Sequence, residues 1–217
     1  MKNTLLILLT IIAFIACQNS NRTPITLPTT IAEIGEVLDS IHIEDQQYRQ
    51  QIQLIVDEHG RDSKEMRSHW KKIRQTDQSN LRVVEEILDK HGWLSSDQVG
   101  RRANSTLFLV IQHADQRTQE KYLPLMREAV NQGNAQGQSL ALLEDRVALG
   151  KGELQIYGSQ IGTDQKTGNM YVLPLVNPET VNERRAEVGL GPIEDYISHW
   201  DLEWDVDKYK EEIAKYN

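Results

Sequence analysis

Two apolar stripes that meet at Gly60 constrain the fold of this chain more than any other feature of its sequence. Both stripes have helical spacing. The first contains Ile34, Leu38, Ile41, Tyr48, Ile52 and Ile55, and the second contains Met66, Trp70, Ile73, Leu81, Val84 and Leu88. Residues at this spacing share one helix face, so we predict helices up to about residue 59 and over residues 62–90. Asp62 and Glu65 have capping-box spacing. The short link between the helices predicts an antiparallel hairpin.

The register of this hairpin brings two carboxylates together. A mirror about the turn pairs the apolar residues in six layers: Ile34 with Leu88, Leu38 with Val84, Ile41 with Leu81, Tyr48 with Ile73, Ile52 with Trp70, and Ile55 with Met66. The layer in the middle pairs Asp45 with Asp77. Buried carboxylates need a raised pKa, an Arg or His partner, or a cation. The alternative is a solvated seam edge with Arg49 and Arg74 as surface ion partners.

A further helix carries a second candidate group. The run 107–111 is entirely apolar, which predicts a helix that is surrounded on all sides. Gln112, His113 and Asp115 follow this run directly. A core histidine that bonds a backbone carbonyl is one interpretation. The clustering of three polar residues favours the other, in which His113 acts as a general acid or base.

The rest of the chain predicts more helix and one small sheet. Helices are expected over about residues 118–132 and 139–149. Asp145 and Arg146 lie on the second of these helices. They are either exposed charges, or the arginine faces the layer of Asp45 and Asp77. Residues 153–161 and 169–176 predict a β-hairpin that carries Tyr157 and Gln160. The fold class is therefore mainly α, a helical bundle with an appended two-stranded hairpin. We expect a helical domain over residues 30–196 and a helical tail over 197–217.

Residues 1–17 predict export and lipid attachment. Lys2 is followed by a largely apolar run over residues 5–16, and then by Cys17. Twelve helical residues span only about 18 Å, short of the ~30 Å hydrocarbon core, so this segment resembles a signal peptide (1–16) more than a membrane span. Ala16 and Cys17 resemble a bacterial lipobox, with Phe14 where Leu is usual. Residues 17–29 would then be a lipidated tether, and the protein would face the periplasm or exterior from a membrane of the cell envelope. A plain cleaved signal is the alternative.

Composition excludes several classes of protein. The net charge of -8 argues against nucleic acid as a partner. A single cysteine excludes disulfide frameworks, zinc ribbons and iron–sulfur clusters. The chain contains no phosphate-binding loop motif and no H-E-x-x-H motif, so we predict no metal site and leave the cofactor open.

Several motifs together resemble a bacterial family of unknown function (DUF6624). They are the run from His91 to Gly100, the Gln-His-Ala-Asp run at 112–115, the Tyr-Gly-Ser-Gln run at 157–160, and residues 181–196. The family also has Asp, Gln and Arg on its first helix, which Asp45, Gln46 and Arg49 match. This chain departs from the family pattern at Leu94 and Ser159. The resemblance covers about residues 40–196, and it implies no activity.

Two functional hypotheses follow from these residues. In the first, the polar groups converge on one pocket that binds or acts on a small envelope ligand, as a hydrolase or transferase. His113, Asp115, Asp45 and Asp77 would be catalytic, and Gln112, Arg49, Asp145, Arg146, Tyr157 and Gln160 would bind the ligand. In the second, the chain is a non-catalytic binding or scaffold module, and the same residues form a ligand pocket or a network that fixes helix register.

Overall fold

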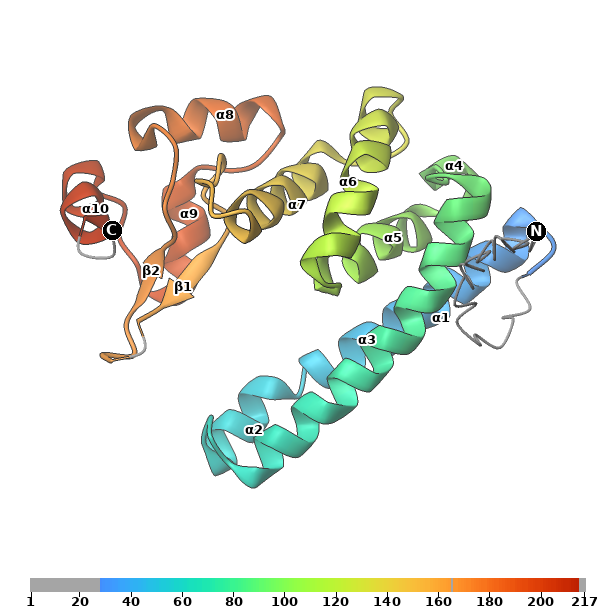
Figure 1. Ribbon diagram of the computed structural model, residues 1–217, viewed down its shortest axis with the longest axis horizontal. Helices are drawn as coiled ribbons and strands as arrows, with labels where there is room; N and C mark the ends of the chain where they lie inside the picture. Colours follow the sequence, from blue (N-terminus) through green and yellow to red (C-terminus); the bar gives the residue numbers. More distant parts are fainter. Residues whose placement is uncertain (1–27, 165, 215–217) are drawn as a thin grey trace, which may run out of the picture.

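The computed structural model describes residues 28–164 and 166–214, and it confirms a mainly α fold with a small β-hairpin (Figure 1). The first part of the chain forms α1 (Ile31–Arg49), α2 (Ile52–His59), α3 (Lys64–His91), α4 (Ser96–Val99), α5 (Arg101–His113), α6 (Gln116–Asn131) and α7 (Gly137–Gly150). The second part forms β1 (Ile161–Thr163), β2 (Met170–Val172), α8 (Val181–Glu187), α9 (Ile193–Ile197) and α10 (Val206–Ile213), with short 3-10 helices at Pro178–Thr180 and Ser198–Trp200.

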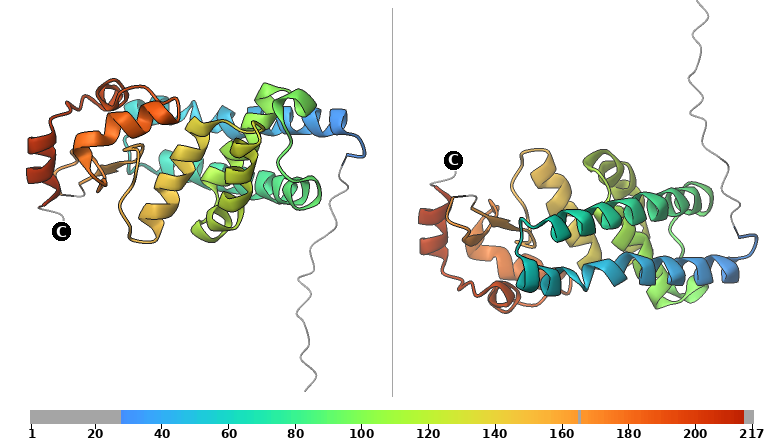
Figure 2. Two further views of the ribbon diagram at one scale, coloured as in Figure 1. Left: turned by 90° about the horizontal axis from the view of Figure 1, so that it is seen from above. Right: turned by 90° about the horizontal axis from the view of Figure 1, so that it is seen from below.

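The antiparallel hairpin predicted around Gly60 is present, with α1 and α2 running against α3 (Figures 1 and 2). Thr30 caps α1 in a capping box with Glu33. Ser63 caps α3 in place of the predicted Asp62, because its hydroxyl accepts a hydrogen bond from the Met66 backbone N–H at 3.0 Å. Gly60 has a φ of 88°, a conformation that suits glycine.

The first arm of the hairpin was predicted as one helix, but it is broken between α1 and α2. The break leaves the Tyr48 carbonyl at a helix end, where the ring Nε2 of His69 donates a hydrogen bond to it at 2.7 Å. Beyond the break, a different face of α3 points inward. His69 of α3 is buried there, whereas Trp70, expected opposite Ile52, is 39% exposed. The predicted layers therefore fail at this end of the hairpin, where α2 has no buried residue.

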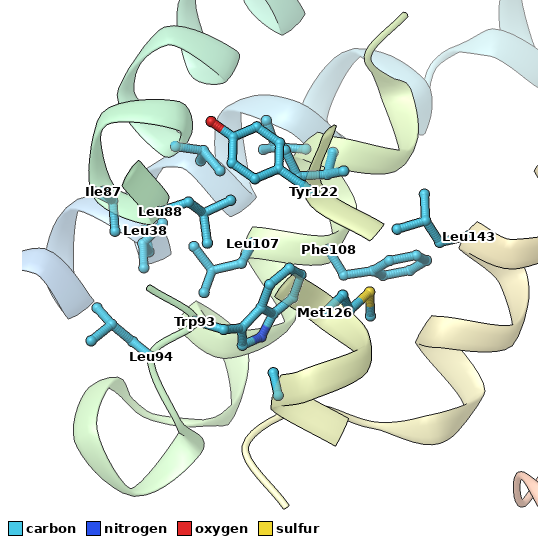
Figure 3. Close-up of a cluster of buried hydrophobic side chains, with 14 of the residues drawn as sticks. Leu38, Ile87, Leu88, Trp93, Leu94, Leu107, Phe108, Tyr122, Met126 and Leu143 are labelled. Carbon is cyan, nitrogen blue, oxygen red and sulfur yellow. The ribbon is translucent and has the colours of Figure 1, made fainter. Parts of the chain in front are cut away.

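Helix α5 lies at the centre of the larger hydrophobic core. It packs against α1 and α3 on one side and against α6 and α7 on the other. Figure 3 shows Leu107 of α5 among side chains from the hairpin, and Phe108 near α6 and α7. Asn104 lies inside α5 and is buried, and its Nδ2 donates to the carbonyls of Leu94 and Asn134. These bonds tie α5 to the segments that precede α4 and α7.

The β-hairpin is antiparallel as predicted, but its strands are much shorter than expected. Only residues 161–163 and 170–172 form the ladder, with Gly162 opposite Tyr171. Upstream, Gln155 forms an isolated parallel bridge with Leu175, and its side-chain Nε2 donates to the carbonyls of Gln160 and Leu173. Gly158 has a φ of 70°, and a Cβ there would lie 2.7 Å from Ile193, so glycine is required by both conformation and space.

A second, smaller core holds the C-terminal part of the chain. It contains Val172, Leu175, Val181, Ile193, Ile197 and Tyr209. Tyr209 belongs to α10, so the helix expected as a tail contributes a buried side chain to this core.

No helix in residues 28–164 and 166–214 is both long enough and apolar enough to cross a bilayer. Cys17, the predicted signal peptide and most of the predicted tether lie outside the described residues.

The position of Leu107 generates a stability prediction. Its side chain is fully buried between the hairpin and α5. Leu107→Ala should lower the free energy of unfolding by about 3 kcal/mol, because the cavity cannot close fully. Urea denaturation measures this change. Leu54→Ala, at a position that is 66% exposed, is the control and should have an effect of less than about 0.5 kcal/mol. Equal losses in the two variants would contradict this placement of the core.

Candidate functional site

The two aspartates expected to meet across the hairpin are joined by an arginine. Asp45 of α1 is buried, with 1% of its side chain exposed, and Asp77 of α3 is 20% exposed. The Arg49 guanidinium donates from one terminal nitrogen to both oxygens of Asp77 at 2.9 Å. Its other terminal nitrogen lies 3.3 Å from Asp45 Oδ1 and donates to the Asp45 backbone carbonyl at 2.8 Å. Arg49 therefore neutralises part of the charge that the apolar seam would otherwise enclose.

His113 completes this group from the end of α5. Its Nδ1 lies 3.1 Å from Asp45 Oδ1, and the ring is 20% exposed. A carboxylate only accepts hydrogen bonds, so Nδ1 carries the proton, and Nε2 of the neutral ring is left with a free lone pair. Nε2 makes no hydrogen bond with any residue in the described ranges. We call Asp45, Arg49, Asp77 and His113 the hairpin cluster.

The environment of Asp45 holds it in the charged form. Burial acts to raise its pKa, but the hydrogen bond and charge of His113, the charge of Arg49 and a hydrogen bond from Gln46 outweigh burial. The pKa of Asp45 therefore lies below its ordinary value. The Gln46 contact is short, with Nε2 at 2.7 Å from Asp45 Oδ2. The hairpin cluster holds two carboxylates and one guanidinium, so its net charge is one negative unit when His113 is neutral and zero when His113 is protonated.

Sequence reasoning did not predict a role for Asn80. This residue is 2% exposed, and its Nδ2 is buried without a hydrogen-bond partner among the described residues. It lies three residues beyond Asp77, which places both side chains on the same face of α3. A buried amide with an unmade hydrogen bond is costly. The sequence feature that could have identified Asn80 is its spacing of three residues from Asp77 on a predicted helix.

The hairpin cluster also has donor atoms of the kind that bind divalent metals. One ligand atom from each of Asp45, Asp77 and His113 lies within 4.8 Å of the others. Metal–ligand bonds of about 2.1 Å place the donors roughly 3–4 Å apart, so the spread here is slightly wide. Arg49 already supplies a positive charge to both carboxylates. A metal ion would therefore have to compete with this guanidinium.

Asp145 and the residues of the predicted strand form a second group. Asp145 is fully buried, and its carboxylate accepts hydrogen bonds from the backbone N–H groups of Ile156, Tyr157 and Ser159 at 2.6, 3.0 and 2.9 Å. It holds the segment 155–160 against α7, so it is not the exposed charge considered from sequence. Gln160 Nε2 donates to the Ser159 hydroxyl at 2.9 Å, and the Tyr157 hydroxyl donates to Glu144 at 3.4 Å. We call Asp145 and the segment 155–160 the loop network.

The remaining predicted residues have other positions. Arg146 does not pair with Asp45 or Asp77, whose ion pairs involve Arg49 and His113, and the titratable group that affects its pKa is Tyr196. Asp115 is exposed and caps α6 by accepting a hydrogen bond from the Thr118 N–H at 2.8 Å. The backbone carbonyl of Gln112 accepts from Gln119. The structure thus divides the residues expected in one pocket between the hairpin cluster, the loop network and a helix cap.

The ion pairs of Asp45 generate a pH prediction. Asp45→Asn should lower the free energy of unfolding by about 3 kcal/mol at pH 7, because Arg49 and His113 would no longer have the buried carboxylate with which they pair. The folded pKa of Asp45 lies below its unfolded value of about 3.9, so its contribution is present above about pH 4 and is lost as the pH falls through the folded value. Urea denaturation should therefore show that the stability difference between the parent and the variant shrinks as the pH falls below about 4.

Asp39 supplies a matched control for this measurement. Its carboxylate pairs with Arg102 at 2.8 Å on the surface, where 36% of the Asp39 side chain is exposed. Asp39→Asn should cost no more than about 1 kcal/mol at pH 7. A stability difference between the parent and Asp45→Asn that stays constant down to about pH 2 would contradict the lowered pKa.

Comparison with known proteins identifies the family alone. No curated protein matches the chain, and no solved structure matches it. Residues 33–207 match a family described as a family of unknown function (DUF6624), and this match includes the hairpin cluster and the loop network. The chain therefore belongs to the DUF6624 family.

Proposed function

We propose that the protein is a lipoprotein of the bacterial cell envelope, attached to a membrane through Cys17. The support is the order of a charged residue, an apolar run too short to span a bilayer, and a small residue before Cys17. Lipid chains on this cysteine would hold the folded part at the membrane surface.

A membrane-fractionation experiment tests this anchor. Cys17→Ser should move the protein from the membrane fraction to the soluble fraction of the expressing bacterium and abolish labelling by radioactive palmitate, because no thiol is left to carry a lipid. Ser20→Ala leaves the cysteine intact and should behave as the parent does. Unchanged membrane association and labelling of Cys17→Ser would refute the anchor.

We further propose that the hairpin cluster performs acid–base chemistry on a small envelope ligand, as a hydrolase or transferase. One observation carries this proposal: His113 is oriented by a buried carboxylate through Nδ1, while Nε2 is unpaired on a partly exposed ring. This is the arrangement that a general base requires, since the carboxylate fixes the tautomer and stabilises the imidazolium that forms.

The chemistry follows from the positions of these groups. Nε2 of His113 takes a proton from a water molecule or a ligand hydroxyl, and the oxygen attacks an electrophilic centre. The leaving group then recovers the proton from Nε2. Asp45 stabilises the transient imidazolium across 3.1 Å, and Arg49 and Asp77 hold the Asp45 backbone and carboxylate in place. The water-activating form is favoured because the chain has no G-x-S-x-G motif.

A non-catalytic binding or scaffold module is the second candidate. The observation that favours it is the contact of one Arg49 nitrogen with both oxygens of Asp77, which links two helices through an ion pair. Such a network can fix helix register without any ligand. In a scaffold of this kind, the loss of His113 would affect stability alone, whereas in a binding module it would also weaken ligand binding without any turnover.

A thermal-shift screen distinguishes these functions. Envelope metabolites and divalent metal ions are tested against the full-length protein in a neutral detergent, with His113→Ala alongside. We expect one ligand to raise the Tm of the parent and leave that of His113→Ala unchanged, because a ligand that binds only the native site stabilises it. The ligand found is then incubated with the parent and with Asp45→Asn, and its turnover is followed by mass spectrometry. Turnover that Asp45→Asn slows by about 100-fold or more supports acid–base catalysis.

His59 provides the matched control for the screen. It lies on α2 at an exposed position, so His59→Ala should respond to the ligand as the parent does. Equal Tm shifts in the parent and in His113→Ala would sink the proposed site. A selective Tm shift without turnover would favour the binding module.

A further inference from the structure

Part of the Arg146 guanidinium lacks a hydrogen-bond partner among the described residues. The side chain is partly buried, and its Nε is sealed from solvent without a hydrogen-bond partner in the described part of the chain. Burial lowers the pKa of this guanidinium, and the Tyr196 phenol acts in the opposite direction. A buried arginine normally pairs with a carboxylate, since its unmade hydrogen bonds are costly. Arg146 makes no ion pair with the residues in the described ranges.

The neighbouring acidic residue is already engaged. Asp145 precedes Arg146 on α7, but its carboxylate accepts three backbone N–H groups of the segment 155–160. The other carboxylate beside it in sequence, Glu144, pairs with Arg127 at 2.8 Å. Neither carboxylate forms an ion pair with Arg146.

A second buried cation, Arg185, also lies near Tyr196. Arg185 is 2% exposed, and its guanidinium donates to the backbone carbonyls of Gly191 and Tyr157 at 2.6 and 2.8 Å. It also lies 5.0 Å from the centre of the Tyr196 ring. The charges of Asp145 and Glu194 act on Arg185, whereas no carboxylate affects the pKa of Arg146. Of these two arginines, Arg146 is the one with a buried guanidinium nitrogen that lacks a hydrogen-bond partner in the described part of the chain.

We infer that Arg146, beside Tyr196 and the loop network, is a binding site for a small oxyanion, either a carboxylate or a phosphate group. A planar guanidinium presents parallel N–H donors that match the paired oxygens of both groups. The Tyr196 hydroxyl donates to the Ser159 carbonyl at 2.8 Å, so the phenol is held in place beside the site. This inference does not depend on the acid–base function of His113.

The net charge of the chain means that long-range attraction cannot bring an anion to this site. A protein of net charge -8 repels anions at long range. An anion that binds nevertheless must gain its affinity from direct hydrogen bonds to an otherwise unpaired group. Binding should therefore depend strongly on Arg146 and only weakly on arginines that lie on the surface.

The test measures anion binding to the full-length protein in a neutral detergent. Sodium phosphate and sodium citrate are titrated separately against sodium chloride of equal ionic strength, and binding is followed by calorimetry and by Tm. We expect a saturable response in at least one of the two, with a Tm rise of roughly 5 °C at about 100 times the Kd. The phosphate and citrate arms decide between the two kinds of oxyanion.

Variants separate the site from general salt effects. Excluded salts such as phosphate stabilise proteins without saturating, and this effect should be equal in all variants. Arg146→Met should abolish the saturable response, whereas Arg74→Met, at an exposed position on α3, should keep it. His113→Ala should also bind the anion as the parent does, so a failure of the acid–base proposal leaves this result intact.

Two results would overturn the inference: no saturable binding of either anion to the parent, or equal binding by Arg146→Met. If Arg146→Met does not fold, Arg146→Lys decides the matter, because it keeps the charge and loses the paired donors. A Kd at least about tenfold weaker in Arg146→Lys supports the site. An unchanged Kd contradicts it.

Discussion

The carboxylate of Asp45 is buried inside the hairpin, and the arrangement of three helices depends on which groups pair with its charge. A lone ionised carboxylate in such a place would be strongly destabilising. Asp45 is met by Arg49 from its own helix and by His113 from α5, while Arg49 also holds Asp77 of α3. Because each partner comes from a defined helical position, the ion network specifies how α1, α3 and α5 lie against one another in a way that apolar contacts alone would not.

The same network accounts for the state of His113. An imidazole at the end of a buried helix could point in several directions, but the bond from Nδ1 to Asp45 fixes its tautomer and leaves Nε2 unpaired. The interaction that orders the hairpin therefore also prepares a proton acceptor at a partly exposed position. Structure and candidate chemistry are coupled here, so changes at Asp45 should affect both, and only a ligand or activity measurement can separate them.

The sequence predicted the parts of this arrangement that follow from periodicity. Helical spacing located the hairpin, and the mirror about its turn placed Asp45 opposite Asp77, because both depend on backbone geometry alone. The break between α1 and α2 was not predictable in this way, since it is accompanied by a contact between His69 and the Tyr48 carbonyl that joins residues far apart in the sequence. The role of Asp145 was missed for a similar reason: its partners are backbone N–H groups, which are the same for every residue type and leave no pattern in a sequence.

The hairpin cluster and the surroundings of the loop network differ in how completely their polar side chains are paired within the chain. In the hairpin cluster, each carboxylate has a cationic or hydrogen-bonding partner from the chain itself. Around the loop network, Asp145 is fully satisfied by backbone donors, whereas Nε of Arg146 has no hydrogen-bond partner among the described residues. Asp145 is directed to the backbone of the segment 155–160, and Arg146, the next residue on α7, does not share it because adjacent side chains on a helix point in different directions. The carboxylate that holds the loop is therefore not the partner of the arginine that follows it.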